Sequence, residues 1–587
     1  MIEKLNLTML TDFYEITMAN GYFCSDMADD IAYFDMFFRR IPDGGGYAIM
    51  AGLEQLIEYL KNLEFTDEDI EYLRAKKLFD ERFLEYLAAF KFTCDVWAVP
   101  EGTPIFPGEP LITVRGPVMQ AQFIETMLLL IINHQSLIAT KASRITRAAA
   151  GRPVMEFGTR RAHGVSAAVY GARAAYIGGC AGTACAIADR EYGTPAMGTM
   201  AHSWVQMYDN EYEAFKKYAE IYPTNCVLLV DTYNVLKSGV PAAIKVFKEV
   251  KPEKMGIRID SGDISYLTKK ARKMLDDAGL QECSIVVSNS LDEYLIRDIL
   301  SEGACVDSFG VGERLITAGS EPVFGGVYKL SALEKNGKMI PKIKKSENIE
   351  KITNPGFKSV YRFFDKDSHR ALADVIVLDG EIIPENDEYE IFDPKAVWKR
   401  KKIKNYYVRN LRKQIFEGGK CVYESPSIDE IKDGDTVAIP DDVTNGGRAL
   451  KVLEAAGLIK IKESAEFNPT IDDIETYNKQ ITIEELKANV IPSTLADVTA
   501  AVVNGNYALD FGLKTEDAIY KDDKLDIEEY WNLIAARSAD LEDADKLETY
   551  KKVVAAFQSD ETEAVFNDQF GGYFIKAGWD QDLLADK

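Results

Sequence analysis

From residue 153 onward, short apolar runs alternate with amphipathic segments of helical period, and this alternation restricts the fold more than any other feature. The apolar runs lie at residues 154–157, 195–201, 226–231, 255–260, 284–288, 308–312 and 323–328. The amphipathic segments between most of them lie at residues 211–221, 240–250, 264–278 and 291–301. Strands and helices that alternate at this spacing form a parallel sheet, because each helix returns the chain to the start of the next strand. The sequence therefore predicts an α/β protein whose strands close a (β/α) barrel or most of one.

The first 150 residues follow a different pattern. Strand, helix, strand and helix signals follow one another at residues 32–40, 53–92, 96–117 and 120–149. Arg39 and Arg40 end the first of these strands, and the turn after them contains three consecutive glycines. The two arginines are compatible with a solvated strand end or with contacts to an anion.

Charge and cysteine usage exclude several classes of partner. The 587 residues carry a formal net charge of −25, whereas nucleic acids and anionic membranes are bound by basic surfaces. The eight cysteines include no C-x-x-C pair, so we expect neither a zinc site nor a disulfide framework. The chain opens without a basic and apolar leader, which favours a cytoplasmic protein.

The last part of the chain differs in composition from the rest. Residues 427–587 contain 35 acidic and 16 basic residues, so they account for −19 of the total charge of −25. All four histidines and all eight cysteines precede residue 427. This change predicts a separate domain at residues 427–587, after units at residues 1–150 and 151–426.

Polar, charged or glycine residues follow most of the predicted strands. These clusters lie at residues 157–161, 199–203, 231–234, 258–263, 288–292 and 310–314. A single cluster of this kind is explained by helix capping, and His202 by itself is compatible with a buried or capping histidine. Six clusters that bring together arginines, carboxylates and a histidine instead indicate the active face of a (β/α) barrel.

The residue types in these clusters suit a phosphorylated sugar. The chain contains neither a Walker A sequence nor a G-x-G-x-x-G that opens a helix. Small-residue turns at 261–262, 310–312 and 325–326 could each hold a phosphate, and Arg160, Arg161, Arg258 and Arg314 could contact anions. Asp231, Asp260 and Asp263 could hold Mg²⁺ or sugar hydroxyls. A ligand with phosphates at both ends and a ribose between them would satisfy this set.

Six spaced motifs together resemble the nicotinate phosphoribosyltransferase family. They are TDFY at residues 11–14, FRR at 38–40, EFGTRR at 156–161, GTMAHS at 198–203, RIDSGD at 258–263 and FGVG at 309–312. The similarity extends from residue 1 to about residue 425. It implies a type II phosphoribosyltransferase fold, in which an N-terminal α/β sandwich packs on an incomplete (β/α) barrel, and a homodimer. The implied reaction converts nicotinate, 5-phosphoribosyl 1-diphosphate and ATP to nicotinate mononucleotide, diphosphate, ADP and phosphate, with Mg²⁺, in NAD biosynthesis.

The resemblance also implies roles for individual residues. His202 is expected to be phosphorylated by ATP, Arg258 and Asp260 to be catalytic, and Asp260 and Asp263 to be candidate Mg²⁺ ligands. Substrate contacts are expected from Tyr14 of the partner subunit and from Arg39, Arg40, Phe157, Thr159, Arg160, Thr183, Ser203, Asp231, Ser261, Gly262, Asp263, Asn289, Gly310, Gly312 and Arg314. Relatives that use nicotinamide carry a carboxylate at the position of Ala184, so nicotinate is favoured over nicotinamide or quinolinate. Glu313 stands where a small hydroxyl residue is expected, and its charge would weaken phosphate binding unless Arg314 compensates.

The last domain resembles a different family, the methionine-binding lipoproteins of ABC transporters. The similarity lies at residues 427–440, 444–450 and 503–508 and corresponds to the second half of a periplasmic-binding-protein fold. It implies that Asn445, Arg448 and Asn504 would contact an amino acid. A lipoprotein signal and most of the first lobe are missing, and half a cleft binds weakly. We therefore expect an α/β lobe that is folded but inert, while amino-acid binding or sensing stays open as an alternative function.

Overall fold

The computed structural model describes residues 6–348, 351–368, 370–384, 387–394, 396–423, 431, 434–462, 465, 468–495, 498–511, 513, 518–521, 536–569, 576 and 579. The chain divides into two compact units, Met1–Glu424 and Ser425–Lys587. The boundary expected between residues 426 and 427 lies outside the described residues. No helix of the described part is both long and apolar enough to cross a bilayer.

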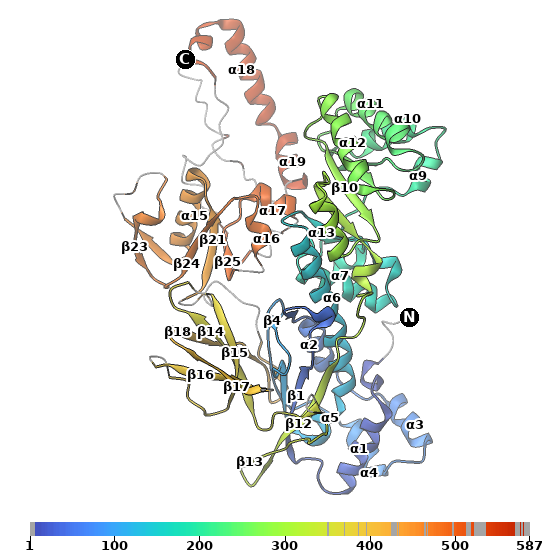
Figure 1. The fold of residues 1–587 in the computed structure, drawn as a ribbon, viewed down its shortest axis with the longest axis vertical. Coiled ribbons are helices and arrows are strands. Elements are labelled where there is room, and N and C mark those ends of the chain that lie inside the picture. Colours follow the sequence, from blue (N-terminus) through green and yellow to red (C-terminus); the bar gives the residue numbers. More distant parts are fainter. Residues whose placement is uncertain are drawn as a thin grey trace. The chain divides into compact units, whose positions relative to one another are not determined.

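The lower part of the larger unit is built on an antiparallel sheet (Figure 1). Its seven strands, in spatial order, are β13 (Lys338–Pro341), β12 (Gly326–Lys335), β1 (Ile31–Phe38), β5 (Ile112–Pro117), β3 (Asp95–Ala98), β19 (Lys413–Glu417) and β20 (Lys420–Cys421). The helices of this part are α1 (Phe13–Cys24), α2 (Leu53–Lys61), α3 (Asp67–Ala75), α4 (Glu81–Ala88), α5 (Val118–Phe123) and α6 (Glu125–Ala148). These helices and strands confirm the predicted order of strands and helices in the first 150 residues.

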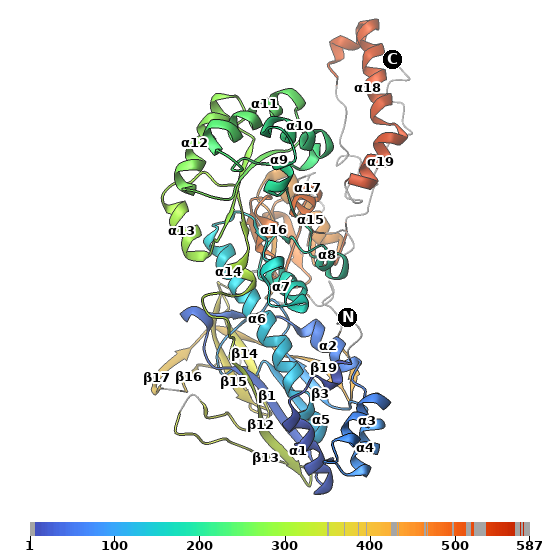
Figure 2. The same cartoon turned by 90° about the vertical axis from the view of Figure 1, so that its right-hand side faces the viewer.

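The second part of the larger unit is a six-stranded parallel sheet, an open half-barrel. Its strands, in spatial order, are β7 (Gly182–Thr183), β6 (Val154–Glu156), β11 (Ser308–Val311), β10 (Ser284–Asn289), β9 (Met255–Ile259) and β8 (Cys226–Leu229). The connecting helices include α7 (Val165–Ile177), α8 (Ala186–Tyr192), α9 (His202–Gln206), α10 (Glu211–Ile221), α11 (Val240–Val250), α12 (Ile264–Asp277), α13 (Glu293–Ser301) and α14 (Glu313–Ile316). Figure 2 shows α6 running from the antiparallel part to the half-barrel. One hydrophobic core extends through both parts, so they form a single unit.

Two of the apolar runs do not form barrel strands. Residues 195–201 make only a single bridge, between Ala196 and Thr183, and the strand there is the two-residue β7. Residues 323–328 lead into β12, which pairs antiparallel with β1 in the other sheet. The reason is packing, because Tyr328 is buried, stacks on Phe34 with 4.9 Å between ring centroids and donates a hydrogen bond to Ala121 O.

Further strands complete the larger unit, and a small α/β lobe forms the other one. A separate sheet contains β14 (Lys358–Asp365), β15 (Ala371–Leu378) and β18 (Tyr406–Asn410), beside the hairpin of β16 (Tyr389–Asp393) and β17 (Ala396–Ile403).

In the smaller unit, β21 (Thr436–Pro440) lies between the parallel strands β24 (Thr482–Leu486) and β25 (Ala500–Ala501), and α15 (Val443–Ala455) contributes to their core. The helix α18 (Ala544–Phe557) of this unit contributes no buried residue, and its apolar side chains Val553 and Phe557 are exposed.

Candidate active site

Arg258, near the end of β9, links the C-terminal ends of β9 and β10 to the segment at residues 195–201. It donates hydrogen bonds to Ser288 Oγ at 2.7 Å, to Thr199 Oγ1 at 3.1 Å and to Asp260 Oδ1 at 2.8 Å. Its side chain is only 14% exposed. The hydroxyl of Ser288 also donates to Asp260. The guanidinium and the carboxylate that sequence motifs predicted to be catalytic are therefore paired and oriented before any ligand binds.

Asp231 joins this group to His202. Its side chain is 2% exposed, and Oδ2 accepts hydrogen bonds from Asp260 N at 3.1 Å and from Ser261 Oγ at 2.6 Å. Its other oxygen, Oδ1, is buried without a hydrogen-bond partner and lies 4.0 Å from His202 Nε2. On the opposite side of the imidazole, His202 Nδ1 lies 3.1 Å from Thr232 Oγ1. His202 is the first residue of α9 and its side chain is 41% exposed, so part of the imidazole faces solvent.

The ring of Phe157 forms an aromatic surface next to these polar groups. Its backbone amide donates to Val311 O at 2.7 Å, and its ring lies 5.4 Å from the Arg258 guanidinium carbon. A Cβ atom at Gly310 would come within 2.5 Å of this ring, so the glycine is required by close approach. Phe157 and Arg258 together offer a flat apolar face with a positive charge beside it.

Glu156, the last residue of β6, supports the same region and was not predicted as a site residue. It is fully buried and accepts hydrogen bonds from Gly158 N and, at 2.6 Å, from Thr183 Oγ1. Burial raises the pKa of its carboxyl above the ordinary value, although these two hydrogen bonds lower it in part. This hydrogen bond links the ends of β6 and β7 and fixes the side chain of Thr183, a predicted substrate contact. Thr199, Thr232 and Ser288 lie in the polar clusters that the sequence analysis placed at the active face, but no individual role was predicted for them.

Several predicted contacts are already engaged within the chain. Arg314 pairs with Asp292, Arg40 pairs with Glu321, and Asp263 caps α12 by accepting a hydrogen bond from Tyr266 N at 3.0 Å. Asn289 Oδ1 accepts from Ser290 N at 2.7 Å. An anion that binds Arg40 or Arg314 would have to displace the paired carboxylate or share the guanidinium with it.

The other predicted site residues are mostly exposed or include buried polar atoms without a hydrogen-bond partner. Arg160 is exposed, and Ser203 lies on α9 next to His202. Buried atoms without a hydrogen-bond partner include Arg39 Nε and Thr159 Oγ1. Gly262 has φ of 91°, and Gly312 precedes α14. Tyr14 lies on α1 and is 43% exposed.

The described residues contain no group of three or more histidine, cysteine or acidic side chains suited to a metal ion. A Mg²⁺ ion at this site would therefore take at most two of its ligands from such side chains, and the others from substrate oxygens and water.

Glu313 is held by its neighbours in the larger unit. It accepts a hydrogen bond from Ser290 Oγ at 3.2 Å and lies 4.0 Å from Arg161. Arg314 is paired with Asp292, so the cation that sequence analysis expected to balance Glu313 is engaged elsewhere.

In the smaller unit, two of the three predicted ligand contacts meet. Asn504 Nδ2 donates to Asn445 Oδ1 at 2.7 Å, and Asp442 fixes Asn445. Asn504 Oδ1 is buried without a hydrogen-bond partner. Arg448 lies one turn after Asn445 on α15.

Family models match nearly the whole of the larger unit. The nicotinate phosphoribosyltransferase N-terminal domain matches residues 9–133, the nicotinate phosphoribosyltransferase family matches 153–372 and its C-terminal domain matches 357–437. The nicotinate phosphoribosyltransferase of Bacillus subtilis is 46% identical over 429 residues, covering 73% of this chain and 87% of that protein. The crystal structure of human nicotinic acid phosphoribosyltransferase matches with a TM-score of 0.61 and 28% identity, covering 71% of this chain and 91% of that one.

The end of the chain matches a second family. The model of the NlpA lipoproteins covers residues 402–578, so the two sets of matches overlap at residues 402–437. Both resemblances that the sequence motifs indicated are confirmed.

Proposed function

The chain belongs to the nicotinate phosphoribosyltransferase family, and from this premise we propose how its strand-end residues perform the reaction. Its activity is the transfer of a phosphoribosyl group to nicotinate, a step of NAD salvage. The fold expected from the sequence, a type II phosphoribosyltransferase with an appended α/β lobe, is confirmed. The proposal depends above all on one observation, the polar chain that runs from Arg258, beside the ring of Phe157, through Asp260 and Asp231 to within 4.0 Å of His202.

In the proposed transfer, the bond from ribose C1 to the diphosphate breaks while the bond from C1 to the pyridine nitrogen forms. The electron pair leaves with the diphosphate, and positive charge develops on the ribose. The carboxylate of Asp260 lies where it can orient the ribose hydroxyls and stabilise that charge, and Arg258 keeps it in place. Mg²⁺, held by Asp260 and Asp263 together with substrate oxygens, would neutralise the leaving group.

His202 has the surroundings of a phosphoryl acceptor. The buried Asp231 carboxylate on the Nε2 side favours the tautomer with a proton on Nε2, so that Nδ1 carries the lone pair, which accepts from the Thr232 hydroxyl and attacks phosphorus once that hydroxyl turns away. In this step the N–P bond forms, the bond to the leaving ADP breaks, and Asp231 stabilises the charge that builds on the ring. Water later takes the phosphoryl group, which couples ATP hydrolysis to transfer.

A homodimer is part of this proposal. The exposed side of α1 carries the apolar side chains of Phe13, Tyr14 and Met18, and Leu10, three residues before the helix, is also exposed. A second copy covering them would bring Tyr14 of the partner subunit toward the pyridine ring. Light scattering should give the mass of two chains, and the mass of one chain would refute the dimer.

A cytoplasmic location stays a prediction.

Replacing Phe157 by alanine should raise KM for nicotinate on the order of tenfold or more, because the ring loses its stacking surface. The KM for 5-phosphoribosyl 1-diphosphate should change much less. Steady-state kinetics with each substrate varied in turn measures both values. Phe157→Tyr keeps the aromatic face and serves as the control; an equal loss in both variants would argue against stacking.

Removing residues 425–587 should leave kcat/KM for nicotinate within about twofold of the full chain. We expect this because each of the two compact units has its own hydrophobic core. Activity of the shortened chain, with its melting temperature as a folding control, is the measurement. Loss of turnover in a folded shortened protein would show that the lobe is part of the enzyme.

The unpaired Asn504 Oδ1 keeps amino-acid binding open as a second function of the lobe. With half a cleft, titration of the full chain with methionine should give no saturation below the millimolar range. Micromolar binding would establish a sensing role for the lobe.

A further inference from the structure

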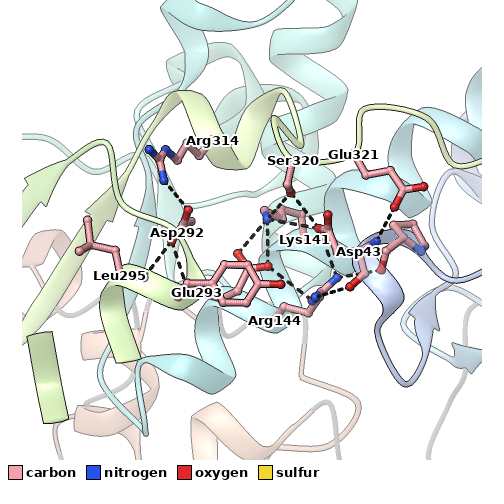
Figure 3. Close-up of polar contacts among 11 residues, drawn as sticks. Asp43, Lys141, Arg144, Asp292, Glu293, Leu295, Arg314, Ser320 and Glu321 are labelled. Carbon is pink, nitrogen blue, oxygen red and sulfur yellow. Dashed lines mark hydrogen bonds and ion pairs between the residues drawn. The ribbon is translucent and has the colours of Figure 1, made fainter. Parts of the chain in front are cut away.

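A buried lysine that takes no part in the proposed chemistry joins three segments of the larger unit. Lys141 lies on α6 and its side chain is 3% exposed. Its ammonium group is 2.8 Å from Glu293 Oε2, 2.8 Å from Ser320 Oγ and 3.4 Å from Asp43 Oδ2. Figure 3 shows these side chains converging on Lys141 from separate elements. A lysine this deeply buried needs such partners, because an isolated ammonium is costly to remove from water.

Arg144, on the same side of α6, shares the two carboxylates. It donates to Pro42 O at 2.8 Å, and it lies 3.3 Å from Asp43 Oδ2 and 3.5 Å from Glu293 Oε1. Two cations and two anions therefore balance in one buried group (Figure 3). The group connects α6 to the start of α13 and to the turn that follows Arg39 and Arg40.

The start of α13 is held from two sides. Glu293 reaches the cations of α6, while its neighbour Asp292 pairs with Arg314 of α14 (Figure 3). Asp292 also caps α13 by accepting hydrogen bonds from Tyr294 N and Leu295 N. Partial burial would raise the pKa of Asp292, but the hydrogen bonds from Leu295 N and Arg314 outweigh it and the pKa is lowered. Both carboxylates are thus anchored, and the loop that leads into α13 is fixed at its end.

That loop begins after Asn289, a predicted substrate contact that ends β10. Asn289 and Ser290 lie just before Asp292, and the Ser290 hydroxyl donates to Glu313 across the edge of the sheet. Arg314, which Asp292 orients, is another predicted contact. The geometry points to Lys141 as a positioning residue for 5-phosphoribosyl 1-diphosphate, which holds the loop after β10 and Arg314 in the arrangement that receives a phosphate. This inference rests on the proposed function, because that function supplies the ligand of the loop.

Replacing Lys141 by methionine keeps the length of the side chain and leaves Glu293 and Asp43 with one cation fewer. KM for 5-phosphoribosyl 1-diphosphate should rise about tenfold, within the range by which packed networks away from a ligand alter binding. KM for nicotinate should stay near the wild-type value, since Phe157 is positioned by Val311 and Gly310 instead. Steady-state kinetics with each substrate varied separately measures this split.

Lys358→Met is the matched control, because Lys358 is 4% exposed and pairs with the equally buried Asp35 between β1 and β14. Both variants remove one buried ammonium and should lower the melting temperature, but only Lys141→Met should raise KM for 5-phosphoribosyl 1-diphosphate. An unchanged KM, or the same rise in both variants, would overturn the role of Lys141. A folded wild-type protein without turnover would instead refute the proposed function.

Glu293→Gln provides a second route if Lys141→Met fails to fold. It removes the anion of the pair and should also raise KM for 5-phosphoribosyl 1-diphosphate. Where all variants fold, the double variant should bind this substrate better than the product of the two single effects predicts, because the two residues act as a unit. Normal KM in Glu293→Gln, or strictly multiplicative effects, would contradict the inference.

Discussion

Replacing His202 by alanine should abolish the stimulation of nicotinate turnover by ATP and leave a slow transfer that does not depend on ATP. The expected fall in kcat/KM with ATP present is on the order of 10²-fold or more, the size found when one electrostatic stabiliser is removed from an active site. The imidazole lies between Asp231 and Thr232, and alanine keeps the start of α9 while removing both contacts. A coupled assay with and without ATP measures the effect.

Labelling with ATP that carries a radioactive γ-phosphate tests the same step directly. The wild-type protein should retain an acid-labile label, and the His202→Ala protein should retain none. Thr232→Val, which removes only the hydroxyl near Nδ1, should be labelled more slowly but to completion. An equally labelled alanine variant, or one still stimulated by ATP, would place the phosphoryl group elsewhere.

Replacing Asp260 by asparagine should lower kcat by about 10²–10³-fold, or roughly 3–4 kcal/mol of transition-state stabilisation. The substitution keeps the size of the side chain but removes the negative charge that faces Arg258 and receives the Ser288 hydroxyl. The charge matters most when the ribose becomes positive, so KM for nicotinate should change much less than kcat. Initial rates at saturating substrates give this value.

Asp277→Asn is a suitable control for Asp260→Asn. It removes the same charge from an exposed position on α12, where Asp277 pairs with Lys273 at 3.0 Å. Its kcat should match the wild type. A similar fall in both variants would mean that the net charge of the enzyme, and not the position of Asp260, sets the rate.

The parts of the fold that could be predicted from sequence are those with a strong local period. The helices at residues 211–221 and 240–250 begin and end where the apolar spacing predicts, and the strands around Arg258 and Ser288 begin as predicted and end within one residue of the prediction. The prediction of barrel strands at residues 195–201 and 323–328 was wrong. Apolar content alone does not determine whether a segment forms a strand or which strand it pairs with. The second run pairs with β1, from which it is separated by nearly the whole half-barrel in sequence.

The residue types and the order of the motifs were sufficient to identify a phosphoribosyltransferase, and they grouped Arg258, Asp260 and His202 in polar clusters of one predicted active face. The fold was needed to show that Asp231 lies between Asp260 and His202, that Glu156 supports Thr183, and that Lys141 meets a carboxylate 152 residues away. Motifs and hydrophobic periods are local along the chain. The partner of a buried charge depends instead on which distant segments the folded core brings into contact, and the spacing of residues in a single sequence does not show this.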